Sequence, residues 1–235
     1  FSASARALPD TDWHVVQLYD FLPELDATVL SARLSRYVVD LNRPPDGQPL
    51  YAGRWETALV PTRTFAGEPI YAHGPDDEPT SGEVRERRAR YWQPYHDALT
   101  RELDRAVRTH GYALLWDAHS IRGRVPSLFE GRLPDLNIGT AAGASCAPTI
   151  ADAVVAAARA DDPSAVLNGR FEGGAITRRY GRPDAGIHAI QLELVQATYM
   201  HEAPPYPFDE VRADRIRPTL RRMLEAFVET GAQSR

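Results

Sequence analysis

The sequence predicts an α/β protein: a single domain built on a mixed, mostly parallel central sheet with helices on both faces. Three observations carry this prediction. YALLW (112–116) is a continuous apolar run, typical of a strand that is covered on both faces. HAIQLEL (188–194) is a second strand pattern, and an Ala-rich helical pattern over 148–160 separates the two. Strands that alternate with helices along the chain favour this fold class.

The first half of the chain contains two helical patterns with less regular segments between them. The spacing of apolar residues predicts a helix over 12–24 and a long helix from Gly82 to about Thr109. β-Branched and apolar residues predict strands or strand-like segments at 27–32 and 35–42. Residues 44–82 hold many Pro and Gly residues with little periodicity, and a loop of that length inside a compact domain is often functional.

The second half continues the alternation. Residues 117–147 are predicted to form a polar loop before the helix at 148–160. A further strand is predicted at 166–170, and a helix at 208–230 closes the chain. Because no internal repeat or low-complexity linker interrupts the sequence, we expect residues 1–235 to form one domain.

Composition excludes several classes of partner. The chain has 235 residues, a net charge of −5 and no Lys, and no block of like charge is present, so we expect no nucleic-acid partner. No apolar run approaches the roughly 20 residues of a membrane span, so we expect no membrane partner. One cysteine, Cys146, fits a reducing compartment, and the N-terminus lacks a signal-peptide pattern, so we expect a cytoplasmic protein. The sequence leaves the oligomeric state open.

Polar residues stand where three predicted strands end, and ligands of open α/β sheets gather at the carboxyl ends of strands. Asp117 and His119 follow the first strand, Glu193 lies in the second, and the segment 40–43 (Asp-Leu-Asn-Arg) ends a third. Taken singly, each has a structural explanation: a His in a loop, a solvated Glu, an Asn-Arg pair at the surface. Asp117 is expected to share a face with His119, and His188 to face away from Glu193.

Together these residues supply the parts of a hydrolase. Neutral imidazole is a good zinc ligand, and a nearby carboxylate serves as a second ligand or fixes the tautomer. A buried Glu beside a metal-activated water can accept its proton. Asn42 and Arg43 offer a planar fork for a carboxylate. The pattern predicts an enzyme that hydrolyses an amide in a small, carboxylate-bearing substrate.

Seven segments, in order from about residue 10 to about residue 202, resemble the N-formylglutamate amidohydrolase (N-formylglutamate deformylase) family. They are DTDWHVVQLYDF, SRYVVDLNRPP, LYAG…T…PT.TF.GEPIY, RYWQPYHDAL, LLWDAHSIR…P.LFEGRLPDLNIGT…SCAP, VLNGRFEGGAITRRYGRP and HAIQLEL..ATYM. The resemblance implies a zinc-dependent hydrolase that releases formate from N-formyl-L-glutamate, the last step of a histidine degradation route. It also implies a fold similar to zinc carboxypeptidases and aspartoacylase. Other divalent metals would suit a His/carboxylate site as well.

The resemblance assigns the metal and the base. His119 matches the family's later zinc-ligand His, and Glu193 matches its general base. The family usually begins with a strand that ends in a Ser-x-Pro-His-x-Gly motif, whose His is the first zinc ligand, and no such motif precedes Asp10. Either the chain as given begins after that strand or it has lost the ligand; we favour the first, because the rest of the pattern is intact. Asp12 is then the carboxylate ligand, with Asp10 as the alternative.

The resemblance also assigns the cations that bind substrate. Arg36 would stabilise the oxyanion on the formyl oxygen. Asn42 and Arg43 would bind one carboxylate of glutamate, and Arg170 and Arg178 are candidates for the other, with loop stabilisation as the alternative role for these two. Two other functions remain open at this point: a zinc amidohydrolase for another N-acyl acidic amino acid, and a non-catalytic carboxylate-binding relative that has lost its metal site.

Overall fold

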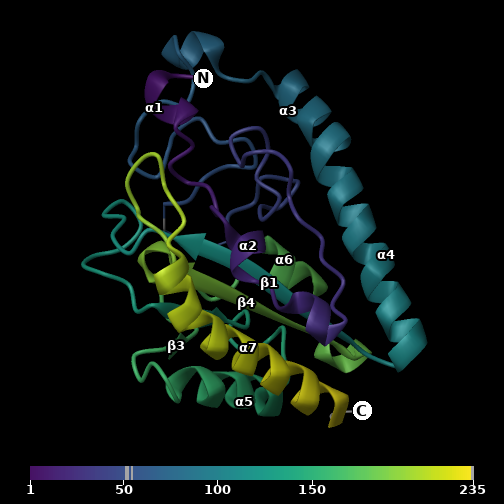
Figure 1. The fold of residues 1–235 in the computed structure, drawn as a ribbon. Helices are drawn as coiled ribbons and strands as arrows, with labels where there is room; N and C mark the ends of the chain where they lie inside the picture. The colour runs from purple at the N-terminus through teal and green to yellow at the C-terminus, as the bar shows by residue number, and fades with distance from the viewer. Residues whose placement is uncertain (51–52, 54, 234–235) are drawn as a thin grey trace. The chain divides into compact units, whose positions relative to one another are not determined.

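The structure, a computed structural model, describes residues 1–50, 53 and 55–233, and its contacts divide the chain into two compact units. Unit 1 comprises residues 1–11, 30–100 and 124–132, and unit 2 the remaining residues. Each unit is described by itself. In chain order the elements (Figure 1) are α1 (Ala3–Arg6), α2 (Val15–Leu18), η1 (Leu22–Leu25), η2 (Gly74–Asp77), α3 (Ser81–Arg87), η3 (Arg88–Trp92), α4 (Gln93–His110), β1 (Ala113–Ile121), β2 (Leu136–Gly139), α5 (Pro148–Arg159), β3 (Val166–Leu167), α6 (Ala175–Tyr180), η4 (Pro183–Ala185), β4 (Ile187–Val195), η5 (Gln196–Thr198) and α7 (Glu210–Gln233).

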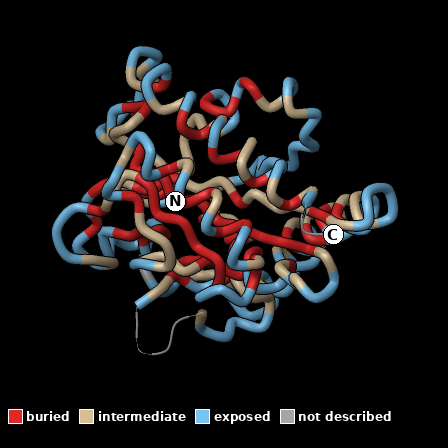
Figure 2. The backbone as a smooth tube through the Cα atoms, turned by 90° about the horizontal axis from the view of Figure 1, so that it is seen from below, coloured by how far each residue is buried: buried red, intermediate tan, exposed pale blue. Residues whose placement is uncertain are grey.

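Unit 2 is built on a four-stranded sheet whose strand order is β1-β4-β2-β3. β1 pairs with β4 in parallel, β2 pairs with β3 in parallel, and β2 and β4 run antiparallel. The predicted α/β class with a mixed, mostly parallel sheet is therefore confirmed. β4 lies inside the sheet, and all nine of its residues are buried. Figure 2 shows the buried segments in red.

The sheet has one apolar face and one polar face, because side chains alternate along each strand. Trp116 of β1 and Leu192 of β4 belong to one hydrophobic cluster with residues of α5 and α7, including Phe227. These two helices pack side by side (Figure 1). The loop before α6 lies against the other face, where the Gly174 N–H donates to the Gln191 side chain of β4.

Unit 1 is organised around a helical stretch that begins at Ser81. A capping box between Thr80 and Glu83 starts α3, because each side chain accepts the other residue's backbone N–H. The π-helical turn η3 joins α3 to α4 and buries Trp92. Trp92 packs with Val39 in a small hydrophobic cluster, so this stretch holds the segment around residue 40 in place.

The predictions are confirmed for elements in which apolar residues recur regularly along the sequence. The helix predicted over 82–109 is the stretch α3–η3–α4, and the helices predicted at 148–160 and 208–230 are α5 and α7. The strand predicted at 188–194 is β4. The strand predicted at 112–116 is longer than expected: β1 continues to Ile121, so the polar residues that follow YALLW lie within the strand and not past its end.

Predictions for weakly periodic segments are wrong. Neither 27–32 nor 35–42 forms a strand, and the helix predicted over 12–24 is reduced to the short turns α2 and η1. The strand predicted at 166–170 has two residues, β3, and the loop predicted at 117–147 contains β2. β-Propensity describes how a side chain fits a paired, half-buried surface, and no strand among the described residues pairs with 27–42 to provide one.

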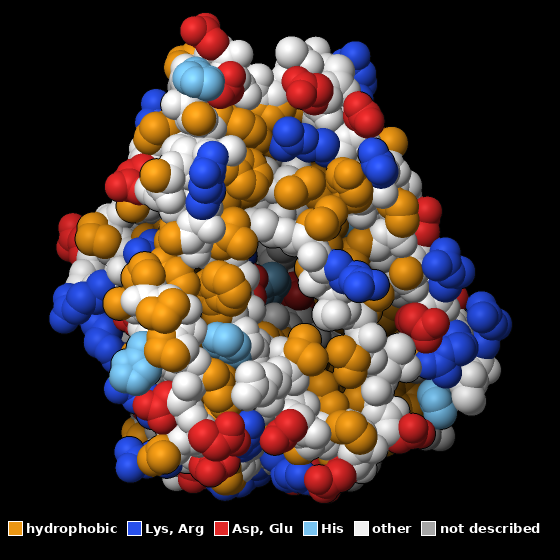
Figure 3. Space-filling view, turned by 45° about the horizontal axis from the view of Figure 1, so that its top comes forward, with side chains coloured by type: hydrophobic (Ala, Val, Ile, Leu, Met, Phe, Trp, Pro, Cys, Tyr) orange, Lys and Arg blue, Asp and Glu red, His pale blue; other side chains and the backbone are white. Residues whose placement is uncertain are grey.

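Other predictions about organisation have mixed outcomes. Of the predicted loop 44–82, residues 51, 52 and 54 lie outside the described residues, and the described part up to Thr80 contains η2. The single domain and the likeness to zinc carboxypeptidases stay predictions. In the part of the chain that the structure describes, no helix is both long and apolar enough to cross a membrane. On the face shown in Figure 3, Arg and acidic side chains are interspersed; the absence of a nucleic-acid partner stays a prediction.

Gly139 allows the loop before α6 to approach the polar face of the sheet. A Cβ at this position would lie 2.5 Å from Gly173 N and 2.7 Å from Glu172 C. Both neighbours are backbone atoms, which cannot turn aside as a flexible side chain can. The close contact of Gly139 therefore fixes the loop against β2.

We expect Gly139→Ala to lower the free energy of unfolding by about 1–3 kcal/mol, the usual cost of overpacking. Urea denaturation measures this loss. Gly82→Ala in α3 is the matched control, since the nearest atom to a Cβ there would be 3.6 Å away and Ala stabilises a helix by about 0.5–1 kcal/mol over Gly. Equal losses in both variants would contradict the close-approach explanation.

Candidate active site

The polar face of unit 2 brings three polar side chains, two of them predicted site residues, into one row across the sheet. His119 on β1 is in register with Glu193 on β4, and Glu193 is in register with Asn137 on β2. The neighbouring row contains Asp117 and Gln191. Registered residues point to the same face, so the polar residues that the sequence placed at separate strand ends lie side by side.

Two carboxylates flank the imidazole of His119. Its Nε2 lies 3.0 Å from Asp117 Oδ1, and its Nδ1 lies 3.5 Å from Asp12 Oδ1. Asp12 is held in turn by the Ser120 N–H, which donates to Oδ1 at 2.7 Å. The predicted shared face of Asp117 and His119 is confirmed, and Asp117 orients the ring.

The charges around His119 favour a positive charge at this position. Burial by itself lowers the pKa of the imidazole, but the carboxylates of Asp117 and Asp12 outweigh burial and hold the pKa of His119 well above its usual range. Asp117 Oδ2 is buried and has no hydrogen-bond partner among the described residues. Asp117 and Asp12 thus present carboxylate oxygens on both sides of the His119 ring.

The geometry separates the two candidates for the carboxylate ligand. Asp10, in unit 1, accepts the Tyr37 hydroxyl at 2.6 Å and the Phe65 N–H at 2.7 Å, and it is 5% exposed. Asp12, in unit 2, faces His119. Asp10 therefore has a structural role in its own unit, whereas Asp12 lies beside His119, the other candidate metal ligand. Metal binding by Asp12 and His119 stays a prediction.

The residues around His119 fit a zinc ion in their chemistry. If Nε2–H donates to Asp117, then Nδ1 carries the lone pair that faces Asp12 Oδ1, and two acceptors 3.5 Å apart are favourable only with a cation or a proton between them. Imidazole nitrogen and carboxylate oxygen are donors that zinc takes in proteins. The described residues contain no group of three or more His, Cys, Asp or Glu side chains that could hold a metal.

Glu193 is held by two amides that the sequence did not single out. Gln191 Nε2 donates to Glu193 Oε2 at 3.3 Å, and Asn137 Nδ2 donates to the Glu193 backbone carbonyl at 3.1 Å. Glu193 is 8% exposed, which excludes the solvated-residue explanation. Alternation along AIQLEL was the available signal for Gln191; Asn137 lies in β2, which the sequence did not reveal.

The candidate carboxylate clamp lies in unit 1 and is organised by Asp40. The guanidinium of Arg36 lies 3.7 Å from Asp40 Oδ2 and that of Arg43 lies 4.0 Å from the same oxygen. The Asn42 N–H donates to Asp40 Oδ1. Arg36 also lies over the Phe65 ring at 5.1 Å. Asp40, which is 3% exposed, thus gathers the three predicted residues Arg36, Asn42 and Arg43 into one cluster.

Part of the hydrogen-bonding capacity of Arg43 is committed within the protein. It donates to the Thr57 carbonyl, the Thr57 hydroxyl and the Asn42 carbonyl. From the helical stretch, Trp92 donates to the Arg43 carbonyl at 3.1 Å and His96 donates to the Leu41 carbonyl at 2.9 Å. These bonds fix the backbone on both sides of Asn42.

Arg170 and Arg178 lie beside the loop that contacts the polar face in unit 2. The Arg170 guanidinium lies 5.2 Å from the centre of the Phe171 ring. Arg178, on α6, donates from Nε to the Gly173 carbonyl at 3.0 Å and lies 3.8 Å from Glu172. These contacts support the loop-stabilising alternative for Arg178, and a role of either Arg in substrate binding stays a prediction.

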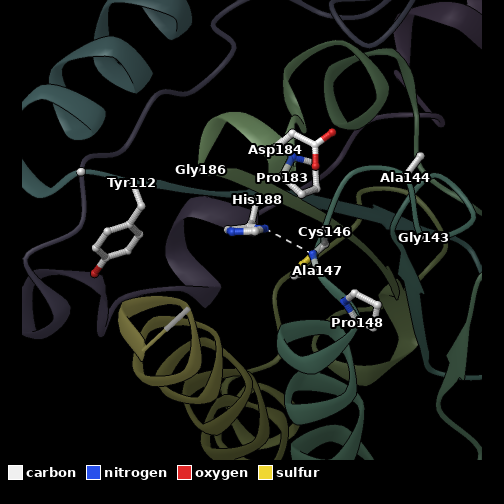
Figure 4. Close-up of a pocket in the computed structure, with 11 residues that line it drawn as sticks. Tyr112, Gly143, Ala144, Cys146, Ala147, Pro148, Pro183, Asp184, Gly186 and His188 are labelled. Carbon is white, nitrogen blue, oxygen red and sulfur yellow. Dashed lines mark hydrogen bonds between the residues drawn. The ribbon is translucent and has the colours of Figure 1, made fainter. Parts of the chain in front are cut away.

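A cavity of about 660 Å³ lies elsewhere in unit 2, near the first residues of β1 and β4. Figure 4 shows its lining, which includes Tyr112, Cys146, Asp184 and His188. His188 accepts the Ala147 N–H at the start of α5, and burial lowers its pKa. None of the predicted site residues lines this cavity. His188 lies five residues before Glu193 on the same strand, so it faces the opposite side of the sheet, as expected. Burial raises the pKa of the Cys146 thiol to about 12, which agrees with a structural role.

Comparisons with known proteins give a consistent result. The profile of the N-formylglutamate amidohydrolase family matches residues 2–200. The N-formylglutamate deformylase of Pseudomonas putida is 52% identical over 231 residues, which cover 97% of this chain and 85% of that protein. The N-formylglutamate deformylase of Pseudomonas aeruginosa is 51% identical over 232 residues, with the same coverage.

Two solved structures are similar to this one. The crystal structure of N-formylglutamate amidohydrolase from Ralstonia eutropha has a TM-score of 0.78 at 27% identity, and the match covers 95% of this chain and 85% of that one. A gene product of Agrobacterium tumefaciens has a TM-score of 0.73 at 19% identity, with 98% and 83% covered. The second similarity concerns the fold alone.

The contrast between Asp10 and Asp12 predicts different effects on stability. Asp10→Ala leaves the buried Tyr37 hydroxyl and Phe65 N–H without this acceptor, so we expect a loss on the order of 1–3 kcal/mol for each donor. Asp12→Ala removes a more exposed carboxylate that accepts the Ser120 N–H and faces His119, so we expect a smaller loss. Urea denaturation of the metal-free protein measures both. A larger loss in Asp12→Ala than in Asp10→Ala would contradict these assignments.

Proposed function

This chain belongs to the N-formylglutamate amidohydrolase family, and we propose that it hydrolyses N-formyl-L-glutamate to L-glutamate and formate. The observation that carries the proposal is 52% identity, over 97% of the chain, to a protein named N-formylglutamate deformylase. The polar row of unit 2 supports it, because a buried Glu193 in register with His119 can supply a base beside a candidate metal ligand, as metal-assisted amide hydrolysis requires. From the family resemblance we further propose that this reaction is the last step of a histidine degradation route, and from the single cysteine that it takes place in the cytoplasm.

Glu193 is the general base and then the general acid of this proposal. It removes a proton from the attacking water as the new bond to the formyl carbon forms. It then delivers that proton to the glutamate nitrogen as the carbon–nitrogen bond breaks, and formate leaves. Burial suits this task, because a base in a water-poor site exchanges its proton with the substrate and not with bulk solvent.

We further propose that His119 and Asp12 hold a zinc ion, with Asp117 fixing the ring of His119. When bound there, zinc acts as a Lewis acid toward the formyl oxygen and favours ionisation of water. Asp117 keeps the proton of the imidazole on Nε2, so that Nδ1 remains available as a ligand. The unpartnered Asp117 Oδ2 and the 3.5 Å approach of Nδ1 to Asp12 are the observations that support this site.

Recognition of the substrate requires two cationic positions, because glutamate carries two carboxylates. We propose that Asn42 and Arg43 bind one of them and that Arg36 stabilises the developing oxyanion. Arg170 and Arg178 are the proposed partners of the other carboxylate. The chain contains no Lys, so Arg supplies its permanently charged side chains, and the planar fork of Arg matches a carboxylate at two points.

Formate release from N-formyl-L-glutamate tests the function. We expect metal-dependent release that dipicolinate abolishes and added zinc restores, with metal content determined by mass spectrometry. N-Formyl-aspartate, N-acetyl-glutamate and N-acetyl-aspartate serve as competing substrates. Undiminished release by metal-depleted protein would contradict the zinc proposal. Preference for another acyl amino acid would replace the substrate, and failure to hydrolyse any of the four by zinc-loaded protein would favour a binding protein.

Replacement of the base tests the role of Glu193. We expect Glu193→Gln to lower kcat by about 10²–10⁴-fold, the usual contribution of a general acid–base group. KM is expected to change little, because no proposed carboxylate contact is lost. Glu130→Gln is the control, since Glu130 is exposed. A kcat for Glu193→Gln within threefold of wild type, about 0.65 kcal/mol in barrier height, would rule out this role.

A further inference from the structure

Gln191 connects Glu193 to the loop that leads into α6. Its Nε2 donates to Glu193 Oε2 at 3.3 Å, and its Oε1 accepts the Gly174 N–H at 2.7 Å. Both bonds are buried, and Gln191 is 4% exposed. The orientation of the amide is fixed by chemistry: a backbone N–H can only donate, so the oxygen must face Gly174 and the NH₂ group must face Glu193.

We propose that Gln191 is a positioning residue that sets the orientation of the Glu193 carboxylate. The inference rests on the proposed function, in which Glu193 is the base. A Glu side chain has three rotatable bonds, and a base must hold its oxygen within hydrogen-bond distance of the proton that it removes. A buried donor on Oε2 restricts those torsions.

The second bond of Gln191 makes this orientation depend on the loop before α6. Two contacts hold the loop against the sheet. Its backbone packs closely on Gly139, and the Ala141 N–H donates to the Glu172 carbonyl. Gly174 is therefore a fixed donor and not a mobile one. Gln191 transmits that fixed position to Glu193, and the same loop leads to Arg178, a proposed substrate contact.

Steady-state kinetics with N-formyl-L-glutamate test the proposal. Gln191→Met keeps the length of the side chain but removes both hydrogen bonds. We expect kcat to fall about 10–100-fold, as is typical when a supporting partner of a catalytic group is removed. KM should stay within about twofold, because a base acts in the transition state and not in substrate binding. The control is Leu192→Met on the same strand, whose side chain belongs to the apolar cluster and is expected to leave both constants unchanged.

Gln191→Glu separates the two bonds. It keeps an acceptor for the Gly174 N–H but replaces the donor to Glu193 with a carboxylate. At pH 8 it should lower kcat at least as much as Gln191→Met, because an ionised carboxylate repels Glu193, and a carboxyl group that shares a proton with Glu193 weakens it as a base. Wild-type kcat in Gln191→Glu would overturn the donor role.

Hydrogen exchange at the Gly174 amide gives a readout that needs no turnover. We expect slow exchange in wild type, Leu192→Met and Gln191→Glu, and faster exchange in Gln191→Met. A wild-type protein without activity would refute the proposed function, whereas unchanged Gly174 exchange in Gln191→Met would refute the link that Gln191 makes. A kcat within twofold of wild type in Gln191→Met, or a rise in KM alone, would overturn the positioning role.

Discussion

The central constraint in this structure is the registration of β1 with β4. Because side chains alternate along both strands, one register sends Trp116 and Leu192 into the hydrophobic cluster under α5 and α7 and turns His119 and Glu193 to the opposite side. A shift by one residue would exchange the two sets. The free energy of burying the apolar face therefore also determines where the polar groups stand, so the hydrophobic core and the candidate active site are two consequences of one pairing.

Burial of polar atoms on this face of the sheet lowers the free energy of unfolding. A buried acceptor without a hydrogen-bond partner costs on the order of 1–3 kcal/mol, and Asp117 Oδ2 and Asn137 Oδ1 are two such atoms among the described residues. Both lie in strands next to β4. Unsatisfied groups of this kind are uncommon in native proteins, and ordered water, an ion, strain or a functional role accounts for them. The amides of Gln191 and Asn137 donate to Glu193, the proposed base, and hold it in place.

The sequence reveals residue types and periods, but not the pairings that bring residues together. The polar residues after YALLW and within HAIQLEL were recognisable because they interrupt strong apolar patterns, and the family resemblance gave His119 and Glu193 their expected roles. Gln191 and Asn137 were not singled out: alternation along AIQLEL placed Gln191 on the face of Glu193, but the role of a neutral amide in a strand is clear only once its hydrogen-bond partners are known, and the sequence did not reveal β2, which carries Asn137. The sequence favoured Asp12 over Asp10 as the carboxylate ligand, and the structure separates the two, because the chain folds Asp10 against Tyr37 and Asp12 against His119. The strands predicted at 27–32 and 35–42 are wrong for the same reason, because the β-propensity of a segment does not show whether a partner strand lies beside it.

We propose that the reaction takes place at the polar row and not in the cavity bounded by Cys146 and His188, and one crystal structure distinguishes the two sites. Crystals of the Glu193→Gln variant, loaded with zinc and soaked in N-formyl-L-glutamate, should hold uncleaved substrate. The account predicts density for the formyl group beside residue 193, and an anomalous zinc peak about 2.0–2.1 Å from the imidazole nitrogen of His119. Substrate density in the cavity near Cys146 and His188, with no zinc at His119, would contradict it.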